Sequence, residues 1–164
     1  QAAAIAAGVE SKRRARIGCM FTVERLGPSH LKQAHELFTM MAQVFEEERA
    51  VLPDEYVQRL LQRADLFILA AVEDGSMVGG LTAHVLPMTR TATSELFIYD
   101  LAVRVDHQRR GIGRALVEEL HARGLAEGID TSFVPADEED THALDFYRAL
   151  GAEESPVRFF VFEP

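Results

Sequence analysis

The segment from Leu96 to Leu116, with the sequence LFIYDLAVRVDHQRRGIGRAL, constrains this chain more than any other. Its first part is apolar and rich in aromatic and branched residues, which favours a buried strand. After a polar turn come Gly111 and Gly113, and apolar side chains then recur every fourth residue from Ile112, as on one face of a helix. The segment therefore predicts a strand, a glycine loop and a helix.

A loop of this kind can hold a phosphate group. Glycines allow a sharp turn, and the N–H groups of the first helical turn have no partner inside the helix and face outward. Arg109, Arg110 and Arg114 surround the glycines in a chain of formal net charge -9, which indicates a bound anion. A plain helix start with solvated arginines is the alternative. Neither the dinucleotide-binding nor the Walker spacing of glycines is present.

Two motifs resemble the signatures of the GNAT acyltransferase superfamily. Residues 108–113, QRRGIG, match the Q/R-x-x-G-x-G/A loop that binds the pyrophosphate of acetyl-CoA in that superfamily. Residues 143–151, ALDFYRALG, are similar to the A-x-x-(L/F)-Y-x-x-x-G segment, whose tyrosine lies near the CoA sulfur. Two signatures in the right order are more specific than either one alone.

The likeness narrows to aminoglycoside 3-N-acetyltransferases of the gentamicin-modifying group. It depends on Leu86-Pro87, on residues 95–103 with the sequence ELFIYDLAV, and on Ala136-Asp137 followed by Asp140, and it covers about Met20 to Phe162. The resemblance implies the GNAT fold. This fold is classed as α/β, or more strictly as α+β. It has a mixed central sheet flanked by helices, and the central strand and the next one splay apart in a V shape.

The function implied by the resemblance is acetyl-CoA-dependent N-acetylation of an aminoglycoside, with CoA as product. The modified position would be the 3-amine of the 2-deoxystreptamine ring, and the activity would confer antibiotic resistance. No metal is implied, because the six histidines and the single cysteine show no metal-ligand spacing. The residues implied in cofactor binding are Leu101, Ala102, Val103, Gln108, Arg109, Arg110, Gly111, Ile112, Gly113, Arg114, Ala115, Asp140, Ala143 and Phe146.

Two residues are candidates for the chemistry. The resemblance makes Tyr147 the general acid for the CoA thiolate, and a packed aromatic on an amphipathic helix is the alternative. Asp100 is anomalous in its own right, because an ionised carboxylate in an apolar strand is costly unless it is paired or faces a cleft. We expect Asp100 to bind the substrate ammonium groups and to act as base. The alternative is a carboxylate paired with one of the protein's own arginines.

The substrate side of the site should be acidic, because the expected substrate is a polycation. The predicted substrate-binding residues are Glu95, Tyr99, Asp100 and Asp137. Asp140 stands where GNAT proteins often have an asparagine that contacts pantetheine, so its role is open. Residues 46–48, three glutamates, are either a solvated helix end or part of a site for cations.

The rest of the chain has the alternating pattern of a three-layer α/β protein. Ser29 and Asp54 are the expected N-caps of two helices, and Gly151 is the expected end of the tyrosine helix. Strands are predicted at 21–26, 66–72, 77–86, 96–103, 130–134 and 157–162, and helices at 31–45, 54–63, from 112 and at 141–150.

Composition sets the outer limits. With 164 residues, 48% of them hydrophobic, the chain is expected to form a single domain over 20–164, with 1–19 as an appended tail or an arm. The net charge of -9 argues against nucleic acid and for cationic partners. Because the single cysteine excludes an internal disulfide and no apolar run reaches the roughly 20 residues of a membrane span, the expected location is the cytoplasm.

Three alternatives stay open at this point. The same chemistry could act on another polyamine or on a protein amine, since an acidic cleft suits any polycation. A non-catalytic CoA-binding sensor belongs to a different functional class. The aromatic residues Phe159, Phe160 and Phe162 could complete the sheet of a homodimer, or they could pack in the core.

Overall fold

The computed structural model describes residues 20–48 and 51–163. These fall into two compact units, of which the first ends at Phe133 and the second begins at Val134. Each unit is described by itself. The expected tail, residues 1–19, lies outside the described residues.

The first unit is built on a five-stranded sheet, which is mixed as the resemblance implied. Its strands are ordered β1-β2-β3-β4-β5; neighbours are antiparallel, except that β4 and β5 run parallel. Asp74 and Gly75 form the expected turn between β2 and β3, and both have positive φ, 49° and 77°. The strands are β1 (Thr22–Arg25), β2 (Leu66–Glu73), β3 (Ser76–Pro87), β4 (Ser94–Val103) and β5 (Ser132–Phe133).

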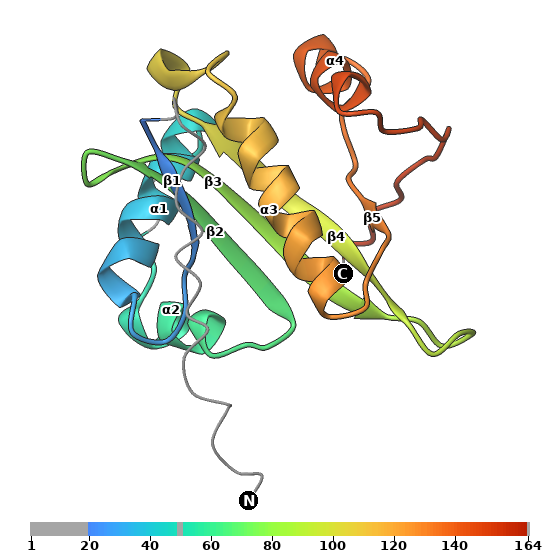
Figure 1. Cartoon of the computed structure of the whole chain (residues 1–164), viewed down its shortest axis with the longest axis horizontal. Coiled ribbons are helices and arrows are strands. Elements are labelled where there is room, and N and C mark those ends of the chain that lie inside the picture. Colours follow the sequence, from blue (N-terminus) through green and yellow to red (C-terminus); the bar gives the residue numbers. More distant parts are fainter. Residues whose placement is uncertain (1–19, 49–50, 164) are drawn as a thin grey trace, which may run out of the picture. The chain divides into compact units, whose positions relative to one another are not determined.

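Helices cover both faces of this sheet, with α3 on one side and α1 and α2 on the other (Figure 1). Two adjacent glycines of β3 permit the close approach. A Cβ on Gly79 would lie 2.7 Å from Cγ2 of Ile112 in α3, and one on Gly80 would lie 2.5 Å from Cδ1 of Leu37 in α1. The helical segments are α1 (Leu31–Val44), α2 (Asp54–Leu61), the short 3-10 helix η1 (Val105–His107) and α3 (Ile112–Ala126).

Both predicted N-caps of the first two helices are wrong. The residue before α1 is His30, whose Nδ1 accepts a hydrogen bond from the Gly27 N–H at 3.0 Å, so the local turn closes without Ser29 as a cap. Pro53 precedes α2, and Asp54 is the first helical residue. The Asp54 carboxylate lies 2.9 Å from the His35 ring, which takes it away from the helix end.

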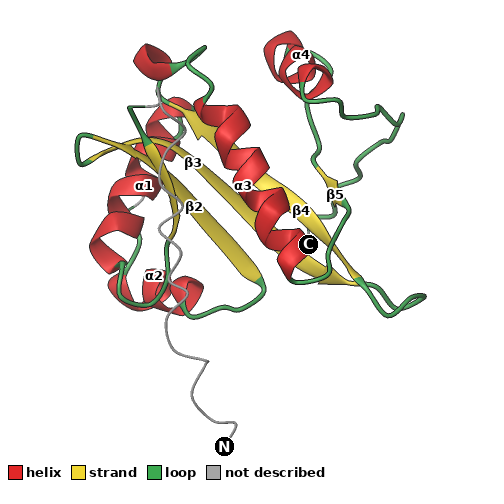
Figure 2. Cartoon of the chain, in the orientation of Figure 1, coloured by secondary structure: helices red, strands yellow, loops and turns green. Residues whose placement is uncertain are grey.

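Over the described residues 134–163, the second unit contains one helix, α4 (Thr141–Ala149), followed by a segment without regular secondary structure (Figure 2). Gly151, with φ of 87°, ends the helix as predicted. The strand predicted over 157–162 is absent from the described residues. Its apolar side chains are exposed, up to 94% for Phe162, so the alternative of core packing is also wrong. A strand requires a neighbouring strand for its backbone hydrogen bonds, and β-propensity alone supplies none.

Candidate active site

The glycine loop has the geometry of an anion site. The left-handed conformation of Gly111, with φ of 84°, turns the chain into α3, and no side chain caps the helix. A Cβ at Gly111 would meet no atom within 4 Å, so this side of the loop is open. Arg109 also has positive φ, 61°, which tightens the turn just before the helix. The predicted order of strand, loop and helix is therefore present, and it fits a pyrophosphate.

One arginine of the loop is bound within the protein. Arg110 Nη1 and Nη2 donate to Glu73 Oε2 and Oε1 at 3.0 and 2.6 Å. Sequence reasoning did not find Glu73. The signal was a carboxylate at the end of a fully apolar strand, but nothing in the sequence connects positions 73 and 110.

The edge of β4 is free over its second half. Its pairing with β5 covers Leu96 with Ser132 and Phe97 with Phe133, while β4 itself continues to Val103. On the side away from β3, the described sheet has no strand beside this continuation. Leu101, Ala102 and Val103, the predicted partners of the pantetheine arm, belong to that stretch. This is the geometry that the expected V-shaped splay requires.

A β-bulge determines which way Asp100 faces. Thr82 of β3 pairs with Asp100 and Ala83 pairs with Ile98, so Tyr99 is an extra residue in β4. Before the bulge, Leu96 packs against α3, where a Cβ on Gly124 would lie 2.8 Å from its Cδ1. After the bulge, the same alternation brings Ala102 into the core under α1. Asp100 therefore lies on the α1 face of the sheet, and sequence periodicity gave no sign of the bulge.

Asp100 has a hydroxyl as its partner. Thr82 Oγ1 donates to Oδ2 at 2.9 Å. Within residues 20–48 and 51–163 no arginine forms an ion pair with Asp100, so the alternative of an arginine partner finds no support there. Burial raises the pKa of Asp100; the Thr82 hydrogen bond lowers it, the charge of Glu47 raises it and that of His84 lowers it. Glu47, just beyond α1, thus acts on Asp100, a link that supports the cation-site alternative for residues 46–48.

Aromatic side chains lie beside this carboxylate on the same unit. Tyr99 is 63% exposed and makes edge-to-face contacts with His84 and Phe97, with ring centroids 5.7 and 5.8 Å apart. Glu95 lies two residues before Phe97 and shares its side of the strand. The predicted substrate residues of the first unit are therefore neighbours along one strand.

The second unit holds the predicted general acid. Burial and, to a smaller extent, the charge of Asp140 together raise the pKa of Tyr147 to about 12. The phenol is therefore protonated at neutral pH. Phe146 packs edge to face on Tyr147 with 5.1 Å between ring centroids.

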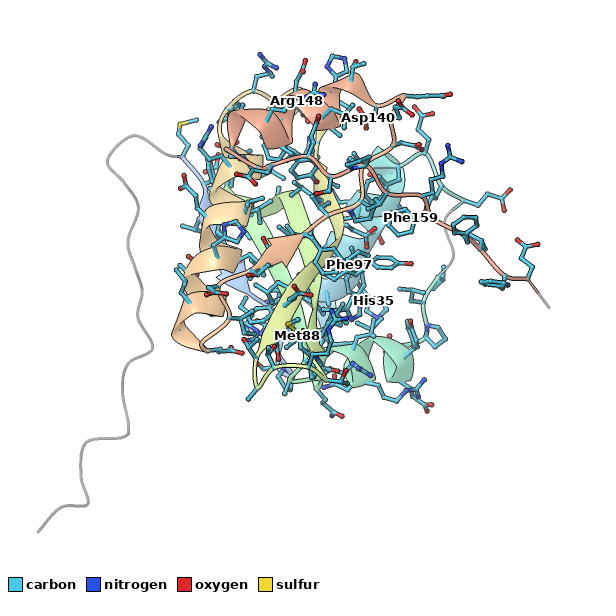
Figure 3. All side chains as sticks on the ribbon, turned by 90° about the vertical axis from the view of Figure 1, so that its right-hand side faces the viewer. His35, Met88, Phe97, Asp140, Arg148 and Phe159 are labelled. Atoms are coloured by element: carbon cyan, nitrogen blue, oxygen red, sulfur yellow. The ribbon has the colours of Figure 1, made fainter. Side chains whose placement is uncertain are left out.

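Asp140 and Asp137 differ in what they contact. Asp140 is the N-cap of α4, where its Oδ1 accepts from the Ala143 N–H at 2.9 Å (Figure 3). This role explains why an aspartate is tolerated at the position. The backbone carbonyl of Asp137 accepts a hydrogen bond from the Asp140 N–H at 3.0 Å. Asp137 itself is exposed at the surface of the loop before α4.

Comparison with known proteins agrees with this geometry. The Acetyltransferase (GNAT) family matches residues 32–152, which is well over half of the chain. This chain belongs to the GNAT acetyltransferase family. In the described residues of this GNAT protein, no group of three or more histidine, cysteine, aspartate or glutamate side chains could hold a metal ion. The helices of the same residues lack the combination of length and hydropathy that a membrane span requires.

Two crystal structures resemble this GNAT protein over most of its length. Both are of the aminoglycoside acetyltransferase meta-AAC0020 from an uncultured soil metagenomic sample. The trehalose complex is 34% identical, with a TM-score of 0.83, over 91% of this chain and 100% of that one. The sisomicin complex is 33% identical, with a TM-score of 0.82, over 88% and 97%.

Two further relatives are more distant. The aminoglycoside N-acetyltransferase AAC(6')-Iy in complex with CoA has a TM-score of 0.71 at 19% identity, over 87% of this chain and 94% of that one, which shows the shared fold alone. The ribosomal protein bS18 alanine N-acetyltransferase of Escherichia coli K12 is 31% identical over 71 residues, 43% of this chain. The match spans about half, 48%, of that curated relative.

Proposed function

We propose that this N-acetyltransferase transfers an acetyl group from acetyl-CoA to an aminoglycoside, at the 3-amine of the 2-deoxystreptamine ring. The observation that carries the proposal is Asp100, a half-buried carboxylate with a hydroxyl as its only hydrogen-bond partner in the described residues. Such a group is stabilised by an external cation. The likeness to an acetyltransferase that was crystallised with sisomicin supports an aminoglycoside as that cation. Resistance to gentamicin-type drugs and action in the cytoplasm belong to the same proposal.

The glycine loop and the β4 edge would hold the acyl donor. When bound, acetyl-CoA supplies an acetyl group already activated as a thioester. The uncapped first turn of α3 and the side chain of Arg109, two residues before Gly111, would attract the pyrophosphate charge. The backbone of Leu101 to Val103, free on one edge, offers hydrogen bonds to an extended ligand, and the Leu101 N–H would stabilise the oxyanion.

Asp100 and Tyr147 would handle the protons. Asp100, ionised, holds an ammonium group of the substrate and takes a proton from the attacking nitrogen, directly or through water. Its raised pKa makes it a stronger base than an ordinary aspartate. Tyr147, with its pKa raised to about 12, keeps its proton at neutral pH and can donate it to the departing sulfur. Glu95 and Tyr99 of the first unit would contact the polycation, and Asp137 of the second unit is a further candidate contact.

A protein amine is the second candidate substrate. The likeness to an alanine N-acetyltransferase of ribosomal protein bS18 favours it, although that likeness covers less than half of this chain. An acidic, partly aromatic surface around Asp100 and Tyr99 would also accept the amine of a peptide.

The test is thiol release from acetyl-CoA with gentamicin, sisomicin, spermidine and a peptide with N-terminal alanine in parallel. Mass spectrometry and NMR of the products would locate the new amide. Acetylation of one deoxystreptamine nitrogen is the expected result. Faster turnover of the peptide or spermidine would replace the aminoglycoside with the second candidate, and CoA binding without transfer to any amine would indicate a sensor.

A further inference from the structure

Glu73 occupies an unusual place for a carboxylate. It is the last residue of β2, and it is 8% exposed in a strand that is otherwise apolar. Both of its oxygens accept hydrogen bonds from the Arg110 guanidinium, at 2.6 and 3.0 Å. The His107 Nε2 lies 3.0 Å from Oε2 of the same carboxylate. Glu73 therefore contacts two residues of the loop between β4 and α3.

These two contacts lie on either side of a strained turn. Between His107 and Arg110, the backbone of Arg109 adopts a φ of 61°, a conformation that is unfavourable for a residue other than glycine. Such a conformation persists only when its surroundings fix it. The bidentate pair with Arg110 and the contact with His107 supply that constraint from a different strand.

The network continues toward the end of β4. The other ring nitrogen of His107, Nδ1, lies 2.8 Å from the Asp106 carboxylate, which accepts hydrogen bonds from Arg104 at 2.7 and 3.1 Å. This network of charged and polar side chains thus runs from Arg104, the residue after β4, to Glu73, and from Glu73 to Arg110. Of its members, Glu73 is the most buried and the only one outside the loop.

The electrostatics fix the charge states of this pair. The Arg110 hydrogen bonds hold the pKa of Glu73 below its usual range, and Glu73 raises the pKa of Arg110. Both groups are therefore charged at neutral pH and neutralise each other. The Arg110 side chain is thereby committed to Glu73, and its contribution to an anion site comes from its backbone.

We propose that Glu73 is the positioning residue of the cofactor loop. By holding Arg110 and His107, it keeps the turn before α3 in the shape that presents N–H groups to the cofactor pyrophosphate. Nothing in the family motif indicates this role, because Glu73 lies far from the motif in sequence. The inference depends on the proposed use of acetyl-CoA by this chain.

The test is CoA affinity of the Glu73→Gln variant, measured by isothermal titration calorimetry without an acceptor amine. Glutamine keeps the shape but cannot balance the Arg110 charge. CoA affinity should fall about tenfold, the scale of a misplaced binding group, and KM for acetyl-CoA should rise while kcat at saturation is retained. The matched control is Asp65→Asn, which breaks an exposed ion pair with Arg63 just ahead of the same strand and should leave CoA affinity unchanged.

A double-mutant cycle distinguishes a specific effect of Glu73 on Arg110 from a general loss of structure in the cofactor loop. If Glu73 acts through Arg110, the losses of CoA affinity in the two single variants should not add. The double variant Glu73→Gln, Arg110→Gln should then bind CoA as tightly as the single variant that has the lower CoA affinity. Should Glu73→Gln fail to fold by circular dichroism, Arg110→Gln and His107→Gln test the same contacts from the loop side. CoA affinity within twofold of the unmodified protein in these variants would overturn the proposal. An unmodified protein that binds no CoA would instead refute the proposed function.

Discussion

Glu73 and Asp100 are two carboxylates placed in apolar strands of the same sheet, and their surroundings are opposite. Glu73 has a guanidinium and an imidazole against it, and these lower its pKa. Asp100 has the hydroxyl of Thr82, with Glu47 acting on it from beyond α1, and its pKa is raised. Removing one partner of a buried ion pair leaves an uncompensated charge, whereas a carboxylate that is buried without a counter-ion is a candidate for ligand binding.

The first prediction tests whether Asp100 serves the chemistry. Asp100→Asn keeps the acceptor for Thr82 but loses the charge and the base. We expect kcat/KM for gentamicin to fall about 10³-fold, within the range of a lost general base, with CoA affinity unchanged. Steady-state kinetics and calorimetry provide the two measurements. Turnover within threefold of the unmodified enzyme would remove Asp100 from the site and leave it as a structural residue like Glu73.

The second prediction concerns Thr82. Thr82→Val removes the hydrogen bond that lowers the pKa of Asp100, so that pKa should rise, and the acidic limb of the kcat/KM profile should move to higher pH. Near the limb, activity should fall about tenfold, and Thr82→Ser should restore it. The pH profile is the measurement. An equal shift in the serine variant, which keeps the hydroxyl, would show that the hydrogen bond to Asp100 is not the cause.

The third prediction concerns Glu47, whose replacement should shift the pKa of Asp100 in the opposite direction. Glu47 raises the pKa of Asp100, so Glu47→Gln should lower that pKa and move the acidic limb to lower pH. If Glu47 also attracts the polycation, KM for gentamicin should rise by about threefold, because one exposed charge contributes little at physiological salt. Glu48→Gln, which alters the neighbouring exposed carboxylate, is the matched control. Equal effects of both changes would show a diffuse field instead of a specific pair.

The fourth prediction compares stability across pH, and it applies to both carboxylates. Because the folded-state pKa of Glu73 is lowered, its stabilisation is present above its unfolded pKa and is lost as pH falls. Glu73→Gln should therefore melt at a lower temperature at pH 7, with the deficit shrinking in acid. Because the folded-state pKa of Asp100 is raised, its ionised form destabilises the fold at pH 7. Asp100→Asn should then melt about 3 °C higher, a gain that disappears below about pH 4.

Thermal unfolding of both variants between pH 3 and pH 8 would measure these opposite signs. The same sign for both variants at pH 7 would contradict the comparison, because the two carboxylates would then contribute to stability in the same way.

The sequence was most informative where structure depends on neighbouring residues. The strand, loop and helix around Gly111 follow from local patterns, and so does the end of α4 at Gly151. The odd position of Asp100 could also be seen, because a charge in an apolar strand stands out without any coordinates.

Contacts between distant positions could not be predicted. Thr82 reaches Asp100 through the register of two strands, and Glu73 reaches Arg110 across 37 positions. The bulge at Tyr99 breaks the period of two on which strand faces are assigned, so no alternation rule could place Asp100 under α1. The strand expected at 157–162 failed for a related reason, since a propensity cannot supply a partner.

The glycine pair in β3 has a consequence for how this protein can change over evolutionary time. Gly79 and Gly80 have no reactive side chain. Gly79 nevertheless sets the distance between the sheet and the first turn of α3, and Gly80 sets the distance between the sheet and α1. Any heavier residue at Gly79 would push Ile112 outward, and with it the helix end that the cofactor loop leads into. A larger side chain at either position would require the packed neighbours to move, although neither glycine takes part in the proposed reaction. The two glycines act as spacers between the sheet and the helices that carry the site.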